Sequence, residues 1–356
     1  MPCWRGARHD SRPGGAGGPD WGAAVGYELG TVTSRDGTQI GYRQIGHGPG
    51  VILVQGAMGT VQNYDQLARA LAEDFTVYVP DRRGRGRSPQ RYGPDHSIEK
   101  EVQDLEALLS HSAACFVFGL SSGALITLES ARVLATIRKA AVYEPPFQLS
   151  GIPAKQIARF HSEVGQGRLA AALVTALGIV KLAPPQVGLI PRPLRVLAAR
   201  LALAGDKGLS LRGYARLREL VPAMRFDFNI VAQRGDRIAS FGEVGTEVLL
   251  LGGSRSPRYL LAALDALEKV LPNAQRVDFP GLDHSAPWNE DRGGSPQTVA
   301  RALRAFFLSG SSSVLHQPRQ PGREAVKDDR CPEGPPEDFQ EQGRERVQVG
   351  GVVFAR

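Results

Sequence analysis

The chain has 356 residues, of which 42% are hydrophobic and 22% are charged, and its formal net charge is +7. This composition is enough for a sizeable core and excludes a protein that is disordered throughout. No stretch approaches the ~20 apolar residues that a membrane-spanning helix needs, and residues 1–25 have glycine and proline where a signal peptide needs an apolar segment.

Apolar stretches alternate with stretches of helical periodicity between two tails, 1–25 and 309–356, which lack periodicity and which we predict to be disordered. In chain order, the predicted strands cover residues 27–46 (a hairpin that turns at Asp36-Gly37), 51–56, 75–80, 114–119, 139–146, 247–253 and 274–281. The predicted helices cover residues 64–74, 97–110, 122–135, 256–271 and 295–308. The last two begin with Ser-Pro, so we expect Ser256 and Ser295 to cap them. This alternation predicts the α/β class, with a mostly parallel, doubly wound sheet.

Residues 147–230 interrupt this alternation. They are rich in Ala, Leu and Arg, have helical spacing and offer no convincing strand. We therefore predict a helical cap that is inserted into a core formed by residues 26–146 and 231–308. Between Phe147 and Ser240, 14 basic residues face 5 acidic ones, an excess of 14 − 5 = +9. We expect these scattered charges to solvate helix faces; attraction of nucleic acid, acidic lipid or an anionic substrate is the alternative.

The segment "GLSSG" lies between a predicted strand and a predicted helix. This is the position in which Gly-x-Ser-x-Gly forms a tight, strained turn that lifts the serine hydroxyl above a sheet. Gly119 and Gly123 are the positions where a larger side chain would clash across that turn. Ser121 is therefore the candidate nucleophile, and a turn without chemistry is the alternative.

A serine nucleophile needs a base and a third group that orients the base. Of the seven histidines, His284 alone follows a late strand and precedes the last predicted core helix. This is the place expected of the base, although a solvated loop histidine is the alternative.

Four segments occur in an order that resembles the α/β-hydrolase fold family, over roughly residues 27–308. They are "VILVQGAMGT", "PDRRGRGRSPQ", "GLSSG" and "FPGLDHSAPWN". The resemblance implies that the backbone N–H groups of Ala57 and Ser122 bind an oxyanion. Gln55 stands where the family usually has histidine, and Leu120 stands where it often has His or Trp.

The acid is not at the family's usual place, because the loop after residues 247–253 reads Ser254-Arg255-Ser256-Pro257. Some members of the fold carry their acid after the strand that follows the elbow helix, and here that position is Glu144. A carboxylate that ends an apolar run also needs a partner. We predict Glu144 as the acid; Asp283, a dyad or an unidentified acid are the alternatives.

These residues predict a hydrolase without cofactor or metal that cleaves a small ester, thioester or lactone through an acyl-enzyme on Ser121. The substrate would carry an apolar acyl or alcohol group. The alternatives are perhydrolase or carbon–carbon bond hydrolysis by the same residues, and an inactive binding protein. Four arginines in "DRRGRGRS" suggest nucleic acid, but no aromatic residues are interleaved with them, so we predict no such partner.

The cysteines, Cys3, Cys115 and Cys331, are far apart in the chain. Their spacing predicts neither a disulfide framework nor a zinc site and fits a reducing compartment. With no signal peptide and no spanning segment recognised, the sequence predicts a cytoplasmic protein.

Overall fold

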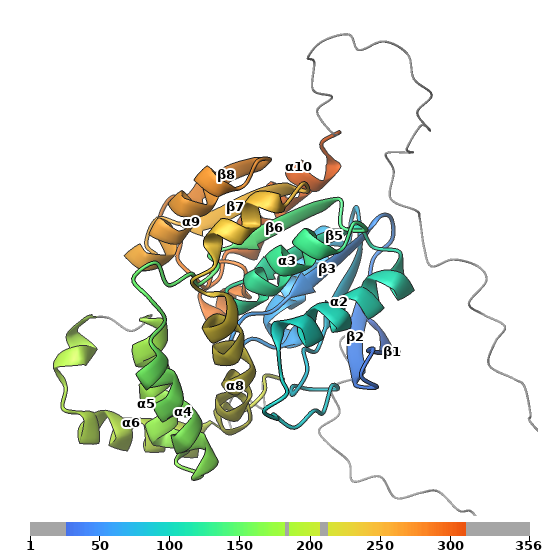
Figure 1. The fold of residues 1–356 in the computed structure, drawn as a ribbon. Coiled ribbons are helices and arrows are strands. Elements are labelled where there is room, and N and C mark those ends of the chain that lie inside the picture. Colours follow the sequence, from blue (N-terminus) through green and yellow to red (C-terminus); the bar gives the residue numbers. More distant parts are fainter. Residues whose placement is uncertain (1–25, 182–184, 207–212, 311–356) are drawn as a thin grey trace, which may run out of the picture.

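A computed structural model describes residues 26–181, 185–206 and 213–310 (Figure 1). The two predicted disordered tails lie outside these residues, apart from Ser309 and Gly310. Within the described ranges, no helix combines the length and the apolarity needed to cross a membrane.

Eight strands form one sheet in the order β1-β2-β4-β3-β5-β6-β7-β8 (Figure 1). Their bounds are β1 Glu28–Thr33, β2 Gln39–Ile45, β3 Gly50–Val54, β4 Thr76–Pro80, β5 Phe116–Leu120, β6 Lys139–Tyr143, β7 Glu247–Gly253 and β8 Ala274–Phe279. β2 pairs antiparallel with β1 and β4, and every other pairing is parallel. The predicted doubly wound α/β sheet is confirmed.

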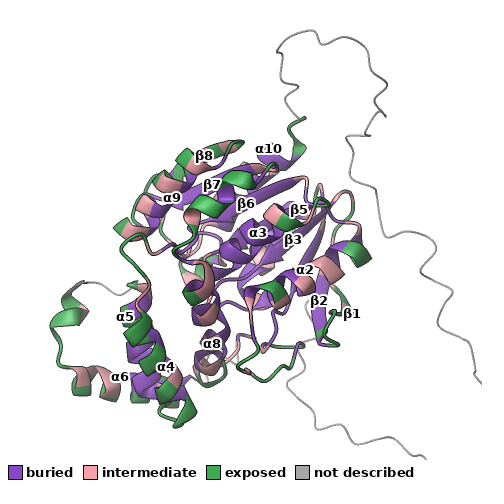
Figure 2. Cartoon of the chain, in the orientation of Figure 1, coloured by how far each residue is buried: buried purple, intermediate pink, exposed green. Residues whose placement is uncertain are grey.

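The sheet is covered on both faces because its central strands are apolar on both faces (Figure 2). In β3, Ile52 and Val54 belong to one core cluster, whereas Val51 and Leu53 belong to the other. The first cluster packs under α2 (Ile98–Ser112), α3 (Ser122–Val133) and α9 (Arg258–Val270). The second packs under α1 (Asp65–Leu71) and α10 (Pro296–Leu308).

Between β6 and β7 the described residues contain helices and no strand. The main ones are α4 Ala154–Gly165, α5 Leu169–Val180, α6 Arg192–Gly205 and α8 Leu217–Arg234, which we call the helical lobe; short 3₁₀ turns occupy Pro185–Leu189 and Ile238–Glu243. The lobe has its own apolar core, which includes Phe160, Leu173, Met224 and Phe228. The expected boundary at residue 230 falls inside α8, because that helix runs on to Arg234.

Three details differ from the sequence-based expectations. Ser256 does not cap α9, because Pro257 is the N-cap residue of that helix. Ser295 is the N-cap residue of α10, as predicted, but its hydroxyl makes no cap hydrogen bond. The Ser256 hydroxyl is buried and has no hydrogen-bond partner. Cys115 is disulfide-bonded, and the other two cysteines lie outside the described residues. The reducing compartment and the cytoplasmic location therefore stay predictions.

Candidate active site

The carboxyl ends of the parallel strands are aligned at one edge of the sheet. Val54 of β3 pairs with Gly119 of β5, and Leu120 at the end of β5 pairs with Tyr143 at the end of β6. Loops that leave these strands therefore begin side by side. Ligands of open α/β sheets bind at this edge.

Ser121 occupies the bend between β5 and α3. Its φ of 56° and ψ of −122° place a non-glycine residue in a rarely populated backbone conformation. The bend is held from both sides: the Ser121 N–H donates to the Tyr143 carbonyl at 2.9 Å, and the Ser121 carbonyl accepts from the Ala124 N–H at 2.9 Å. The strain is thus fixed by the sheet and by the first turn of α3.

Gly119 and Gly123 leave no room for a side chain. A Cβ atom at Gly119 would lie 2.3 Å from Thr127 Oγ1, and one at Gly123 would lie 2.5 Å from the Val54 carbonyl oxygen. Both distances are far below van der Waals contact, so the bend requires glycine two residues before and two residues after Ser121.

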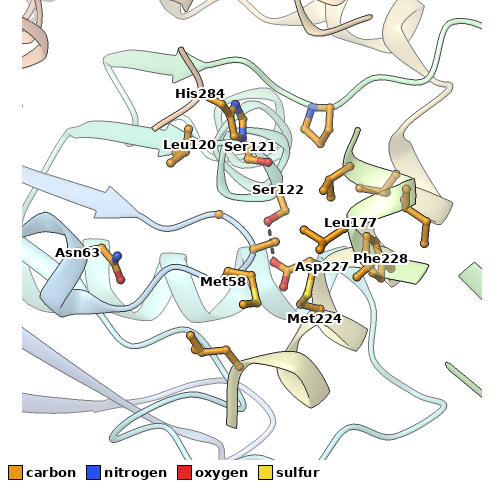
Figure 3. Close-up of a pocket in the computed structure, with 18 of the residues that line it drawn as sticks. Met58, Asn63, Leu120, Ser121, Ser122, Leu177, Met224, Asp227, Phe228 and His284 are labelled. Carbon is orange, nitrogen blue, oxygen red and sulfur yellow. Dashed lines mark hydrogen bonds between the residues drawn. The ribbon is translucent and has the colours of Figure 1, made fainter. Parts of the chain in front are cut away.

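Glu144 and His284 meet although 140 residues separate them. Glu144 follows β6 with a φ of 48° and is fully buried. Its Oε2 atom lies 2.6 Å from His284 Nδ1, and its Oε1 atom accepts the Gly253 N–H at 2.7 Å. With Nδ1 directed at the carboxylate, Nε2 is the nitrogen available for other groups, and Figure 3 shows the His284 ring beside Ser121.

Asp283, the alternative acid, points elsewhere. It is exposed, and its Oδ1 atom accepts the N–H and the hydroxyl of Ser285 at 2.9 and 2.7 Å. Neighbouring residues of the loop thus face different surroundings: His284 faces Glu144, whereas Asp283 closes a local turn.

An apolar cavity of about 270 Å³ lies between this sheet edge and the helical lobe (Figure 3). Ser121 and His284 both line it. A large part of its remaining wall comes from α5 and α8, including Leu173, Leu177, Val180, Leu220, Met224 and Phe228. The cavity therefore offers a largely apolar environment beside the Ser121 hydroxyl and the His284 imidazole.

The residues predicted to bind an oxyanion line the same cavity. Ala57 lies in the turn after β3, and Ser122 is the first residue of α3, whose initial N–H groups have no acceptor within the helix. Gln55 is fully buried, and its side-chain amide donates to the Pro80 carbonyl at 2.8 Å within the sheet.

Beneath the cavity lies a cluster that the sequence reasoning missed, which we call the buried ion cluster: Arg82, Arg85, Glu101 and Asp227. Asp227 of α8 binds Arg82 Nη1 at 2.7 Å, also pairs with Arg85 Nη2, and accepts the Ser122 hydroxyl at 2.6 Å. Arg82 Nη2 lies 2.8 Å from Glu101 of α2. All four side chains are almost completely buried.

Electrostatics keep this cluster charged. Burial disfavours the Asp227 carboxylate, but the guanidinium groups of Arg85 and Arg82 outweigh burial and hold the pKa of Asp227 below its usual value. Burial likewise opposes the charge of Glu101, yet Arg82 holds the pKa of that carboxyl well below its usual range.

Three of the four arginines of "DRRGRGRS" lie inside the protein and not on its surface. Arg82, Arg83 and Arg85 are buried, and Arg83 pairs with Asp36 and Asp104; Arg87 is exposed. In the described part of the chain, no group of three or more His, Cys, Asp or Glu side chains gathers as a metal site would.

Comparison with known proteins gives a partial sequence match and matches to solved structures over most of the chain. Over 96 residues the chain is 35% identical to the uncharacterized hydrolase YraK of Bacillus subtilis. This match covers 26% of the chain and 35% of YraK, so the chain spans only about a third of that relative's length. An alpha/beta hydrolase structure from Sphaerobacter thermophilus matches with a TM-score of 0.64 and 28% identity, over 78% of this chain and all of the other. A thermophilic esterase from Thermogutta terrifontis matches with a TM-score of 0.56 and 18% identity, over 79% and 98%.

A family model for the alpha/beta hydrolase family matches residues 51–303. This range begins in β3 and ends in α10, so it contains Ser121, Glu144, His284 and the whole buried ion cluster. The strand order and the strained serine bend fit that match, and the chain belongs to the alpha/beta hydrolase family.

Proposed function

We propose that the protein is a serine hydrolase that cleaves a small ester, thioester or lactone through an acyl-enzyme on Ser121. The observation that carries this proposal is the 2.6 Å contact between Glu144 Oε2 and His284 Nδ1, made beside a strained serine in one cavity. A serine, an imidazole and a buried carboxylate in this relation supply nucleophile, base and orienting anion.

In the proposed mechanism, Ser121 Oγ attacks the substrate carbonyl while His284 Nε2 takes the hydroxyl proton. The Glu144 carboxylate holds the imidazole through Nδ1 and stabilises the imidazolium that forms. The N–H groups of Ala57 and Ser122 bind the developing oxyanion. His284 then donates its proton to the departing alcohol, thiol or hydroxyl, and water deacylates Ser121 by the same route in reverse.

The cavity wall favours an apolar acyl or alcohol group, because α5 and α8 present aliphatic and aromatic side chains to it. We propose that the helical lobe acts as a cap that covers the apolar group of the bound substrate. We further propose Glu144, and not Asp283, as the acid, since the Asp283 carboxylate is engaged by Ser285.

Hydrolysis of p-nitrophenyl esters of increasing acyl length tests the proposal. We expect the wild type to turn them over with a preference set by chain length, and Ser121→Ala to lose activity by at least about a thousandfold. A folded wild type that hydrolyses no ester, thioester or lactone would support an inactive binding protein instead.

A further inference from the structure

We propose that Arg85 is a positioning residue that aims and polarises the Ala57 N–H, and that Asp227 of the helical lobe holds Arg85 in place. This inference rests on the proposed serine hydrolase function and adds a link between the lobe and the oxyanion site. Neither Arg85 nor Asp227 was a predicted site residue.

The first step is the contact between Arg85 and the turn after β3. Arg85 Nη1 donates to the Gly56 carbonyl at 2.8 Å and to the Gly59 carbonyl at 3.2 Å. The Gly56 carbonyl and the Ala57 N–H belong to one planar trans peptide, so fixing the carbonyl fixes the direction of the N–H. A cation on the carbonyl oxygen also draws electron density from the nitrogen, which makes the N–H a stronger donor.

The second step is what holds the guanidinium groups. Arg82 Nη1 donates to the Gln55 carbonyl at 3.0 Å. The two guanidinium groups therefore bind three carbonyl oxygens of this turn, those of Gln55, Gly56 and Gly59. Asp227 binds both cations, and it is the acceptor of the Ser122 hydroxyl as well. One carboxylate therefore connects the turn that carries Ala57 with the helix start that carries the second oxyanion donor.

The third step is the origin of Asp227. It lies on α8, the helix that also supplies Leu220, Met224 and Phe228 to the cavity wall. Figure 3 shows Asp227 below Ser122 with Met224 and Phe228 nearby. Ala57 and Met58 in turn pack against the lobe's apolar core. A substrate bound in the cavity therefore contacts α8, the same helix whose Asp227 holds the turn that carries Ala57.

Arg83 provides a matched control within the same loop. It is as buried as Arg85 and is held by two carboxylates, Asp36 and Asp104. Its described hydrogen bonds go to those carboxylates and to the Lys100 carbonyl, away from the turn after β3. Shortening either arginine to lysine thus perturbs a buried ion pair, but only Arg85→Lys disturbs the Gly56–Ala57 peptide.

The experiment compares Arg85→Lys with Arg83→Lys in p-nitrophenyl ester hydrolysis, with folding checked by circular dichroism. A lysine has one nitrogen where Arg85 uses two, so it cannot bind Gly56 and Asp227 in the same way. We expect kcat to fall roughly 10- to 100-fold in Arg85→Lys with KM nearly unchanged, less than the loss of a whole oxyanion donor. We expect kcat of Arg83→Lys to stay within about twofold of the wild type, because none of its contacts reaches the reacting atoms.

A second readout separates positioning from general damage. A trifluoromethyl ketone forms an anionic hemiketal with the serine, whereas the matching methyl ketone mostly stays neutral. Arg85→Lys should weaken inhibition by the trifluoromethyl ketone by the same factor as kcat/KM, and leave binding of the methyl ketone unchanged. If Arg85→Lys does not fold, Asp227→Glu displaces both guanidinium groups and should show the same pattern.

Equal effects of the two lysine variants, or equal weakening of both ketones, would overturn this inference. So would an unchanged kcat in folded Arg85→Lys or, where that variant does not fold, in Asp227→Glu. If the wild type hydrolyses no ester at all, the proposed function fails, and that result is distinct because it precedes any comparison of variants.

Discussion

Two fully buried carboxylates flank the serine bend, and they have opposite kinds of partner. Glu144 faces one imidazole, that of His284, and an imidazole can take up and give back a proton during catalysis. Asp227 faces two guanidinium groups, which do not lose their charge in proteins. The first arrangement can accommodate a proton that moves; the second fixes charge and geometry. Burial alone therefore does not distinguish the two carboxylates, whereas the kind of partner that each one faces does.

The largest expected effect is the loss of turnover when the carboxylate that faces His284 is removed. Glu144→Gln keeps the shape but removes the charge that stabilises an imidazolium, so we expect kcat for ester hydrolysis to fall by roughly 10³–10⁴. Asp283→Asn is the matched control and should stay within about twofold of the wild type. A large loss in Asp283→Asn with none in Glu144→Gln would reverse the assignment of the acid.

The next effect is on stability, where we expect the loss of Asp227 to cost more than the loss of Glu144. Asp227→Asn leaves two buried guanidinium groups short of a counter-ion, so we expect the free energy of unfolding to fall by about 3–5 kcal/mol. Glu144→Gln leaves no guanidinium group without a counter-ion, and should cost about 1–2 kcal/mol. Urea denaturation at pH 8 measures both, and equal losses would contradict the contrast.

The pH dependence of that loss sharpens the contrast. The pKa of Asp227 lies below its usual value, so its stabilising contribution is complete above the ordinary aspartate pKa of about 4 and is lost as the pH falls through the lower folded value. The stability difference between wild type and Asp227→Asn should therefore be constant from pH 8 to about 5 and shrink below about 4. A difference that already shrinks between pH 8 and 6 would mean that Asp227 is not held ionised.

The smallest effect concerns Ser122, whose hydroxyl binds Asp227 at 2.6 Å. Ser122→Ala removes that bond but keeps the backbone N–H and both ion pairs of Asp227. We expect a stability loss of about 1–2 kcal/mol and a fall in kcat of only a few-fold. If Ser122→Ala lost activity as completely as Ser121→Ala, the assignment of Ser121 as the nucleophile would be contradicted.

The sequence predicted the sheet because each central strand is a short apolar run with turn residues at its ends. For that reason β5 was found to within two residues at each end, and β6 begins at the predicted residue, although it ends three residues earlier than predicted. It also selected Ser121, Glu144 and His284, since each follows a strand end where a polar side chain has no packing role. The contact of Glu144 with His284 joins residues that stood as candidates before any geometry was known.

The buried ion cluster was not predictable in the same way. Arg82 and Asp227 lie 145 residues apart, and no local periodicity connects a loop to a helix of the lobe. One signal was present: Asp227 lies between Phe226 and Phe228 in an apolar stretch, where a carboxylate needs a buried cation. Ser256 shows the converse error, because Ser-Pro predicted a cap whereas Pro257 takes the N-cap position.

Mapping the adduct of a fluorophosphonate probe by peptide mass spectrometry tests the central claim most directly. The account predicts one phosphonyl group, on Ser121, formed at least about a hundredfold more slowly in His284→Ala and in Glu144→Gln. An adduct on Ser122, or a labelling rate at Ser121 that neither variant changes, would contradict the claim that His284 and Glu144 activate this serine.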